Sequence, residues 1–169
     1  MASLTERMLG AAQLDGRTYQ QVERDKTADT QALIVAALSS VAAGLGARAG
    51  LRGVILGSIA AMALWVIWTT IVYWVGTNVL PEQDTQADWG QVARTVGFAQ
   101  APGVLRVFAI IPVLGEVIRA VVDVWVLIAT VIAVRQALDY RSWPRALGVS
   151  AIGWGVYVIG FAIVRRMLA

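Results

Sequence analysis

The feature that most constrains the fold is a long apolar run in the first half of the chain. Residues 53–76 read GVILGSIAAMALWVIWTTIVYWVG and contain no charged side chain. About 20 consecutive apolar residues let a helix cross the hydrocarbon core of a bilayer. The chain of 169 residues is 58% hydrophobic and 15% charged, whereas soluble domains average about 25% charged residues. A soluble domain of this size buries only about two-thirds of its surface, so lipid is predicted to surround these helices.

Five transmembrane helices are predicted from the apolar runs. Their approximate ranges are 27–46, 53–79, 89–111, 115–138 and 144–164. The third run is diluted by Arg94, Gln100 and Arg106. Pro102 is expected to kink it, because a proline leaves the carbonyl of Phe98 without its helical partner. A bent span is therefore favoured over the alternative, a re-entrant segment.

The N-terminal segment, residues 1–26, has a different character and is polar. Ser3 followed by Glu6 forms a capping-box pattern at the start of a helix. Leu4, Met8 and Ala11 then share one helical face, which predicts a short amphipathic helix on the membrane surface; a frayed tail is the alternative. The predicted fold class is an all-α polytopic membrane helical bundle, with residues 27–169 as a transmembrane domain of five helices.

Basic residues indicate the orientation of the spans. Eight of the Lys and Arg residues fall in the N-terminal segment, the loop 80–96 and the turn 135–145, and four lie on the other side: Arg48, Arg52, Arg165 and Arg166. Loops rich in Lys and Arg remain in the cytoplasm. This bias predicts a multi-pass protein of the cell inner membrane with a cytoplasmic N-terminus. If the third segment only re-enters, the C-terminus would also be cytoplasmic.

Small residues at helical spacing are expected to pack the bundle. They are Ala36, Ser40 and Gly44 in the first span, Gly53, Gly57 and Ala61 in the second, and Gly148, Ala151 and Gly155 in the fifth. Membrane helices gain little from burying leucine against leucine, so close backbone approach matters more. Packing within the chain is the expected use of these faces, and contact between copies of the chain is the alternative.

Charged residues interrupt the fourth apolar run. Residues 110–125 read IIPVLGEVIRAVVDVW, in which Glu116, Arg119 and Asp123 share one helical face. The turn containing Pro112 and Gly115 folds a hairpin that brings Arg106 level with this face. Because an unpaired charge near the bilayer centre costs about 3 kcal/mol, a buried network of the four charges is predicted to fix the hairpin register. The alternative is a polar path in a small transporter, which a water-filled cavity reaching Asp123 would favour.

Composition excludes several kinds of chemistry. The chain contains no Cys and no His, which excludes disulfides, thiolate chemistry, Cys/His zinc sites and histidine acid–base catalysis. Ser, Thr and Asp form no nucleophile–base pattern, and no Gly-rich phosphate loop is present. The net charge of +3 suits cytoplasmic loops better than nucleic-acid binding. No catalytic residue, cofactor or metal is therefore predicted, and the expected partners are membrane lipids, a second copy of the chain or a larger membrane complex.

Two segments carry a resemblance to a known family. The runs GFAQAPGVLRVFAIIPVLGEVI and WVLIATVIAVRQALDYRS are similar to the prokaryotic branch of the Yip (Ypt-interacting protein) domain family, and the N-terminal lead-in resembles it as well. The resemblance implies five spans and a cytoplasmic N-terminus. Eukaryotic relatives bind Rab-type GTPases and act in vesicle transport and membrane shaping. Because this chain lacks the longer cytoplasmic region that carries those contacts, Rab-type GTPase binding is not expected, and no catalytic residues are implied.

The predicted function follows from these observations. We expect a non-enzymatic membrane protein with a membrane-organising, scaffolding or membrane-shaping role. One alternative is a small transporter or channel that uses a polar site at Arg106 and Asp123. Another is an accessory subunit of a larger membrane complex.

Overall fold

The computed structural model describes residues 2–83 and 85–168, and the secondary structure of these residues is helical. The elements in chain order are α1 (Leu4–Ala12), α2 (Gly16–Arg24), α3 (Ala28–Gly46), α4 (Gly50–Trp74), the π-helix η1 (Val75–Val79), α5 (Trp89–Ala99), the 3₁₀-helix η2 (Ala101–Ile110), α6 (Gly115–Ala137) and α7 (Trp143–Leu168). The all-helical prediction is thus confirmed. The helices follow the predicted apolar ranges because their ends coincide with the Gly, Pro and polar turns between the runs.

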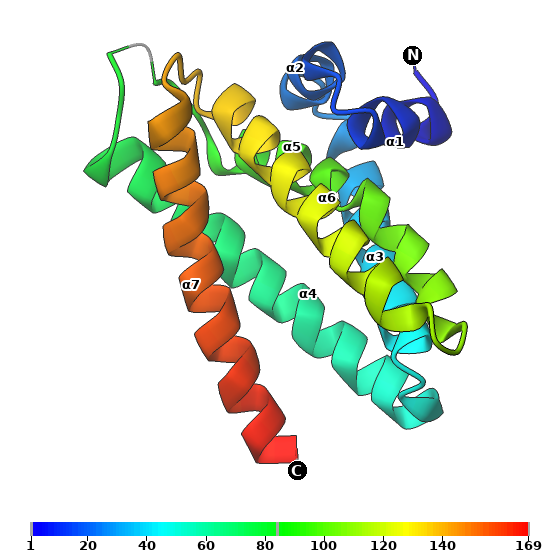
Figure 1. Cartoon of the computed structure of the whole chain (residues 1–169). Coiled ribbons are helices and arrows are strands. Elements are labelled where there is room, and N and C mark those ends of the chain that lie inside the picture. Colours follow the sequence, from blue (N-terminus) through cyan, green and yellow to red (C-terminus); the bar gives the residue numbers. More distant parts are fainter. Residues whose placement is uncertain (1, 84, 169) are drawn as a thin grey trace.

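The long helices form a bundle in which successive segments run in opposite directions (Figure 1). The turns at 47–49 and 111–114 lie at one end, together with the C-terminus of the chain. The opposite end carries α1, α2, the connection 80–88 and the turn 138–142. We call this the N-terminal end, and we call α1 and α2 together the N-terminal layer.

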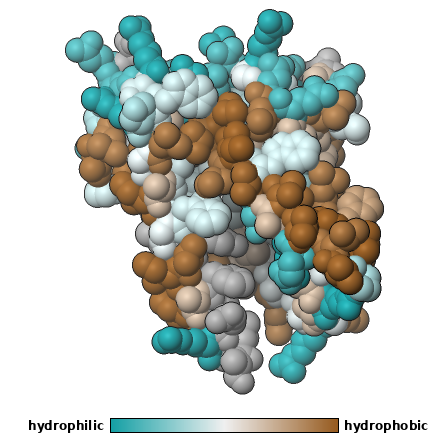
Figure 2. Space-filling model, viewed as in Figure 1, coloured by the Kyte–Doolittle hydropathy of each residue, from teal (hydrophilic) through white to brown (hydrophobic). Residues whose placement is uncertain are grey.

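Three helices are long and apolar enough to cross a membrane by length and composition, among the residues that the structure describes. They are Ala28–Gly46, Gly50–Val79 and Gly115–Ala137. Large hydrophobic side chains such as Ile59, Val117 and Ile128 are exposed on the outside of these helices, and Figure 2 shows hydrophobic surface between hydrophilic ends. Exposed apolar surface of this extent is typical of helices surrounded by lipid.

The third predicted span differs from the expected kinked α-helix. α5 ends at Ala99, and the chain continues from Ala101 as a 3₁₀-helix with Pro102 in its first turn. Proline cannot donate the α-helical bond to Phe98. The chain instead tightens: the N–H of Gln100 donates to Gly97 and that of Gly103 donates to Gln100. Pro102 therefore marks a change of helix type at the place where the kink is predicted.

The predicted amphipathic face of α1 packs against protein. Ser3 and Glu6 form the expected capping box. Ala11 is fully buried, and Leu4 and Met8 pack against the same core cluster, which includes Phe98, Ala99, Ala101, Ala129 and Ala133. The predicted helix is present, and its apolar stripe covers the N-terminal end of the bundle rather than pointing away from the protein.

Candidate functional site

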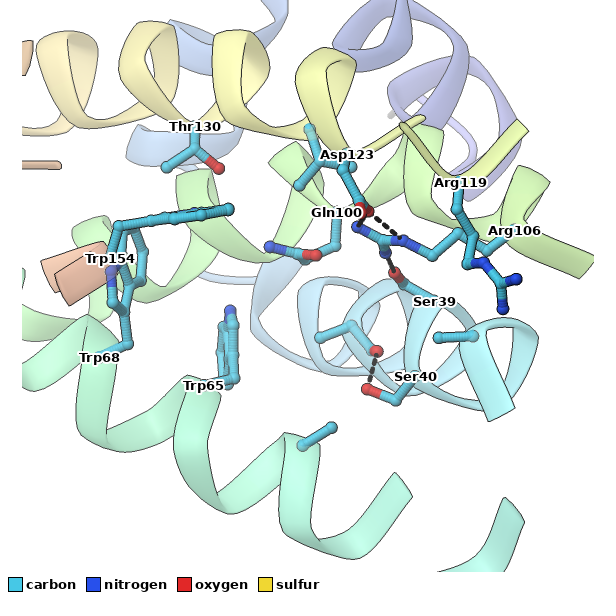
Figure 3. A pocket seen from close by; sticks show the side chains of 14 residues that line it. Ser39, Ser40, Trp65, Trp68, Gln100, Arg106, Arg119, Asp123, Thr130 and Trp154 are labelled. Atoms are coloured by element: carbon cyan, nitrogen blue, oxygen red, sulfur yellow. Dashed lines mark hydrogen bonds and ion pairs between the residues drawn. The ribbon is translucent and has the colours of Figure 1, made fainter. Parts of the chain in front are cut away.

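A cavity of about 340 Å³ lies within the bundle, between α3, α4, η2, α6 and α7 (Figure 3). This volume lies at the lower end of the range of about 300–1,000 Å³ that small-molecule sites occupy. The wall combines small apolar side chains with polar and aromatic ones, which are Ser39, Ser40, Gln100, Arg106, Arg119, Asp123, Thr130, Trp65, Trp68 and Trp154. Figure 3 shows the charged residues at one end of the cavity and the tryptophans at the other.

Arg106 and Asp123 form an ion pair at the charged end. The Nη2 and Nε of Arg106 lie 2.8 and 2.9 Å from Oδ1 of Asp123, and its Nη1 donates to the hydroxyl of Ser39 at 3.1 Å. The side chain of Arg106 is 17% exposed and that of Asp123 is 51% exposed. The pair joins η2 to α6 as the hairpin predicts, and Ser39 ties both to α3.

Two glycines let the backbone of η2 approach α3 closely. A Cβ on Gly103 would lie 2.1 Å from the Oγ of Ser39 and 2.6 Å from Nη1 of Arg106. A Cβ on Gly46 would lie 2.0 Å from the carbonyl oxygen of Arg106. All three distances are below 3.0 Å, closer than Cβ atoms approach other atoms, so the position of Arg106 depends on these residues being glycine.

Glu116 and Arg119 form a second pair within α6. The Glu116 side chain is 85% exposed and that of Arg119 is 35% exposed. The sequence predicts one buried network of four charges. The structure instead joins these four residues in two separate ion pairs, and both carboxylates are exposed. The reason is local, because Glu116 lies one helical turn from Arg119, while Arg106 is held by Asp123 and Ser39.

Trp65 and Trp68 close the other end of the cavity. Their side chains are 7% and 5% exposed, and neither indole N–H has a hydrogen-bond partner among the described residues. A buried donor without a partner costs about 1–3 kcal/mol. In Figure 3 the indole nitrogen of Trp65 points into the cavity on the side of Gln100. The indole nitrogen of Trp68 abuts α7, where a Cβ on Gly153 would come within 2.3 Å of it.

The cavity wall offers more donors than acceptors. Arg106, Arg119 and the indole of Trp65 supply N–H groups, whereas Asp123 is the one carboxylate among the described lining residues and is paired with Arg106. Within the described residues no group of three or more His, Cys, Asp or Glu side chains is placed to hold a metal ion. The arrangement suits the binding of a hydrogen-bond acceptor in largely apolar surroundings.

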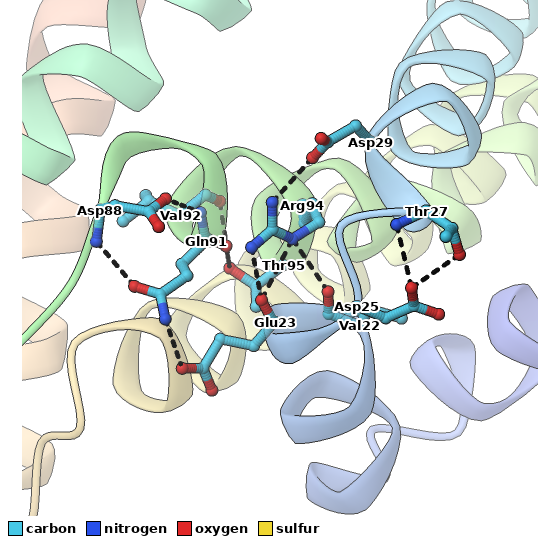
Figure 4. Close-up of polar contacts among 10 residues, drawn as sticks. All are labelled: Val22, Glu23, Asp25, Thr27, Asp29, Asp88, Gln91, Val92, Arg94 and Thr95. Carbon is cyan, nitrogen blue, oxygen red and sulfur yellow. Dashed lines mark hydrogen bonds and ion pairs between the residues drawn. The ribbon is translucent and has the colours of Figure 1, made fainter.

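A second polar region fixes the N-terminal layer to the bundle (Figure 4). Arg94 of α5 is buried, and its Nε lies 3.1 Å from the carbonyl oxygens of both Val22 and Glu23. Its Nη2 donates to the carbonyl of Glu23 at 2.6 Å, and its Nη1 pairs with Asp29 at 2.8 Å. The last carbonyls of a helix lack intrahelical partners, so Arg94 caps α2 and holds it against α5.

Arg7 makes a similar connection from α1. Its side chain is 2% exposed and pairs with Asp25 between α2 and α3, while its Nη1 donates to Gln31 at 3.0 Å. Hydrogen bonds from Thr27 and Arg7 lower the pKa of Asp25 to about 2. The indole of Trp125 on α6 donates to the carbonyl of Ala12 at 2.8 Å. The N-terminal layer is thus attached to three long helices.

Glu23 is the unusual carboxyl group of this layer. Its side chain is buried, and its Oε1 accepts a bond from Gln91 at 3.4 Å. Burial, and then the negative charge of Asp139, raise the pKa of Glu23 to about 7. Protonation of this side chain therefore changes near neutral pH.

The turn after α6 completes the N-terminal end. The Tyr140 hydroxyl lies 2.9 and 2.8 Å from the carbonyl oxygens of Gly76, in the π-helix η1, and of Leu80, just after it. The backbone N–H groups of Arg141 and Ser142 donate to Glu82 at 2.9 and 3.1 Å. This network connects the segment ALDY to the end of the second predicted span.

The predicted small-residue faces are used unevenly. Ala36 is buried, the hydroxyl of Ser40 donates back to Ala36, and a Cβ on Gly44 would lie 3.2 Å from the Cα of Val54. α3 therefore packs closely on α4. Ala61 lines the cavity.

Other predicted packing positions lie on the outside of their helices. A Cβ on Gly57 or Gly155 would meet nothing within 4 Å, Ala151 is exposed, and Gly53 and Gly148 make no tight contact with another helix. The buried face of α7 instead contains Ala146, Val149, Ser150 and Gly153. The small residues that were predicted to pack on the fifth span therefore lie on a different face of α7 from the buried residues.

Sequence reasoning missed the buried roles of Arg7, Glu23 and Arg94. Arg94 looked like a residue that weakens a span, and Arg7 like the polar edge of a surface helix. One signal was present for Arg94: a charge inside an apolar run is paired or functional more often than not. Its acceptors are backbone carbonyls, which leave no mark in the sequence.

These observations define a class of integral membrane protein, namely a bundle of apolar helices with a polar helical layer fixed at one end. The Yip1 domain model matches residues 16–164, and the chain belongs to the Yip1 domain family. This confirms the predicted resemblance to the Yip domain family. No curated protein and no solved structure matches the chain significantly.

Proposed function

We propose that this Yip1-family protein crosses the cell inner membrane five times with its N-terminus in the cytoplasm. The three apolar helices are supplemented by α7 and by α5 with η2. At about 1.5 Å per α-helical residue and 2.0 Å per 3₁₀ residue, α5 and η2 together extend roughly 36 Å, which exceeds the ~30 Å hydrocarbon core. The excess of Lys and Arg at the N-terminal end supports the orientation.

The proposed role is non-enzymatic and consists of organising or shaping the membrane. The observation that carries this proposal is the attachment of the N-terminal layer through the buried Arg94 and Arg7. A polar helical surface in a fixed position on one side of the bilayer is what a scaffold requires, because lipid headgroups or another protein then meet a defined arrangement of side chains.

Reconstitution of the full chain into vesicles tests this role. Vesicle size and shape are recorded by cryo-electron microscopy as the protein-to-lipid ratio rises. We expect progressively smaller or tubular vesicles with the natural chain and with Arg17→Ala, and a weaker effect with Arg94→Ala, which releases the N-terminal layer. Vesicles that keep their size at dense protein loading would contradict the proposal.

The cavity favours a second candidate, a small transporter or channel. It reaches Asp123, the carboxylate for which the sequence suggests a polar path. The test is solute or proton flux into proteoliposomes. A flux that Asp123→Asn abolishes, in a protein that remains folded, would favour transport over scaffolding.

Assembly with other chains is a third proposal. Gly57 and Gly155 offer small positions on exposed helix faces, which is compatible with a second copy of the chain or with a larger membrane complex. Gentle extraction at native abundance, followed by native electrophoresis, distinguishes a monomer from either assembly.

A further inference from the structure

We infer that the cavity binds a phospholipid with an anionic headgroup, which enters from the side of the bundle between α6 and α7. The inference goes beyond the proposed membrane-organising role. It depends on three observations: the charge of the cavity wall, an unpaired donor inside it, and the position of its opening.

The charge of the wall favours an anion. Arg106 and Arg119 line the cavity together with one carboxylate, Asp123. Glu116, the partner of Arg119, is 85% exposed, and an exposed pair of this kind is weak and readily exchanged. Arg119 can therefore turn from Glu116 to a phosphate, for which a guanidinium is a strong donor.

The unpaired donor lies deeper in the cavity. Trp65 is 7% exposed, its indole N–H has no partner among the described residues, and the nitrogen points into the cavity (Figure 3). A buried N–H of this kind is satisfied when an acceptor occupies the space in front of it. The ester carbonyls of a phospholipid, which follow the phosphate along the molecule, supply such acceptors.

The position of the cavity matches a lipid in its own leaflet. Arg119 lies about 6 Å along α6 from Gly115, at the end away from the N-terminal layer, and the tryptophans lie further inside (Figure 3). A headgroup at Arg119 thus directs its acyl chains toward the bilayer centre.

The cavity wall reaches the outer surface of the bundle on α6 and on α7. Asp123 on α6 and Trp154 on α7 line the cavity and are also exposed at 51% and 41%. On the face shown in Figure 2, a group of hydrophilic atoms interrupts the hydrophobic surface. A molecule already dissolved in the bilayer reaches such an opening directly.

Lipid titration of the detergent-purified chain, followed by native mass spectrometry, tests the inference. The probes are dioleoyl phosphatidic acid, dioleoyl phosphatidylcholine and glycerol phosphate. We expect one phosphatidic acid per chain, bound at least about tenfold more tightly than the other two. Arg119→Gln and Trp65→Phe should each weaken phosphatidic acid binding about tenfold, which corresponds to one lost hydrogen bond to the ligand. Trp74→Phe, at an exposed tryptophan, should leave phosphatidic acid binding unchanged.

Each other result overturns the inference. Equal binding of phosphatidylcholine would remove the preference for an anion, and equal binding of glycerol phosphate would show a site for a free phosphate group rather than a lipid. If both variants bind phosphatidic acid as tightly as the natural chain does, the lipid binds elsewhere on the protein. If no lipid binds, water is the acceptor for the indole N–H of Trp65. Circular dichroism checks folding, and Arg119→Gln decides the test if Trp65→Phe fails to fold. The lipid titration does not measure vesicle remodelling, so failure of lipid binding is distinguishable from failure of the scaffold proposal.

Discussion

Among single residues, Arg94 has the largest expected effect because its buried donors satisfy backbone carbonyls in the last turn of α2. Arg94→Ala should lower the free energy of unfolding by about 3 kcal/mol, since it removes hydrogen bonds from a charged group and leaves buried acceptors unpaired. Thermal or denaturant unfolding in detergent measures this loss, and trypsin cleavage inside residues 1–26 reports release of the layer.

The matched control for that experiment is Arg17→Ala, because Arg17 is exposed on the same layer. It should change stability by no more than about 0.5 kcal/mol. An equal loss in both variants would show that Arg94 does not hold the layer in place.

Glu23 makes the attachment of the N-terminal layer depend on pH. The folded pKa is about 7 against an ordinary value of 4.5, so between these values the folded chain binds a proton that the unfolded chain does not. The stabilising contribution is complete below pH 4.5 and is lost as the pH rises through about 7. The charged groups that act on Glu23 are Asp139, Arg24, Arg94 and Asp88.

Hydrogen exchange of α2 at pH 5.5 and pH 8 measures this dependence. Relative to α6, α2 should lose protection at the higher pH in the natural chain. In Glu23→Gln the carboxyl group is absent, and the protection of α2 relative to α6 should be the same at both pH values. A pH effect that persists in Glu23→Gln would assign it to another group.

At the scale of elements, the contact between η2 and α6 depends on the pair Arg106–Asp123. Asp123→Leu should destabilise the bundle by about 3 kcal/mol, because it leaves an unpaired guanidinium within the membrane. Arg106→Met combined with Asp123→Leu should recover most of this loss. Unfolding of the two single variants and the double variant provides the coupling energy; simple additivity would show that the pair does not join the two elements.

The long helices were predictable from the sequence, whereas two features of the elements were not. Apolar runs of sufficient length, separated by Gly, Pro and charged turns, indicate where membrane helices begin and end. The 3₁₀ conformation after Pro102 was missed because a proline allows either a kink or a change of helix type. The docking of α1 was missed because its apolar stripe fits lipid and protein equally well, and its partners Phe98 and Ala101 are distant in sequence.

The candidate site was predictable in part. Hairpin geometry brings Arg106 to Asp123, since both lie at similar distances from the turn at Pro112. The tryptophans of the cavity were not linked to this pair, because Trp65 and Trp154 belong to other helices whose rotation the sequence does not determine. Helix packing alone places them opposite the charges.

At the scale of the whole molecule, five crossings require that residues 86 and 166 lie on opposite sides of the membrane. The natural chain has no Cys, so Gln86→Cys, Arg48→Cys and Arg166→Cys each provide a single label. A membrane-impermeant thiol reagent should reach Gln86→Cys from the cytoplasmic side, and the other two from the opposite side. Labelling after solubilisation is the control, and labels at 86 and 166 on one side would disprove five crossings.

The packing of α7 has a mechanical consequence. Ala146, Val149 and Gly153 are buried on the side of α7 that packs into the bundle, and a Cβ on Gly153 would come within 2.3 Å of the indole nitrogen of Trp68 on α4. A side chain at position 153 would therefore push α7 away from α4 next to Trp154, which lines the cavity. The spacing of α4 and α7 beside the cavity thus depends on one residue that has no side chain.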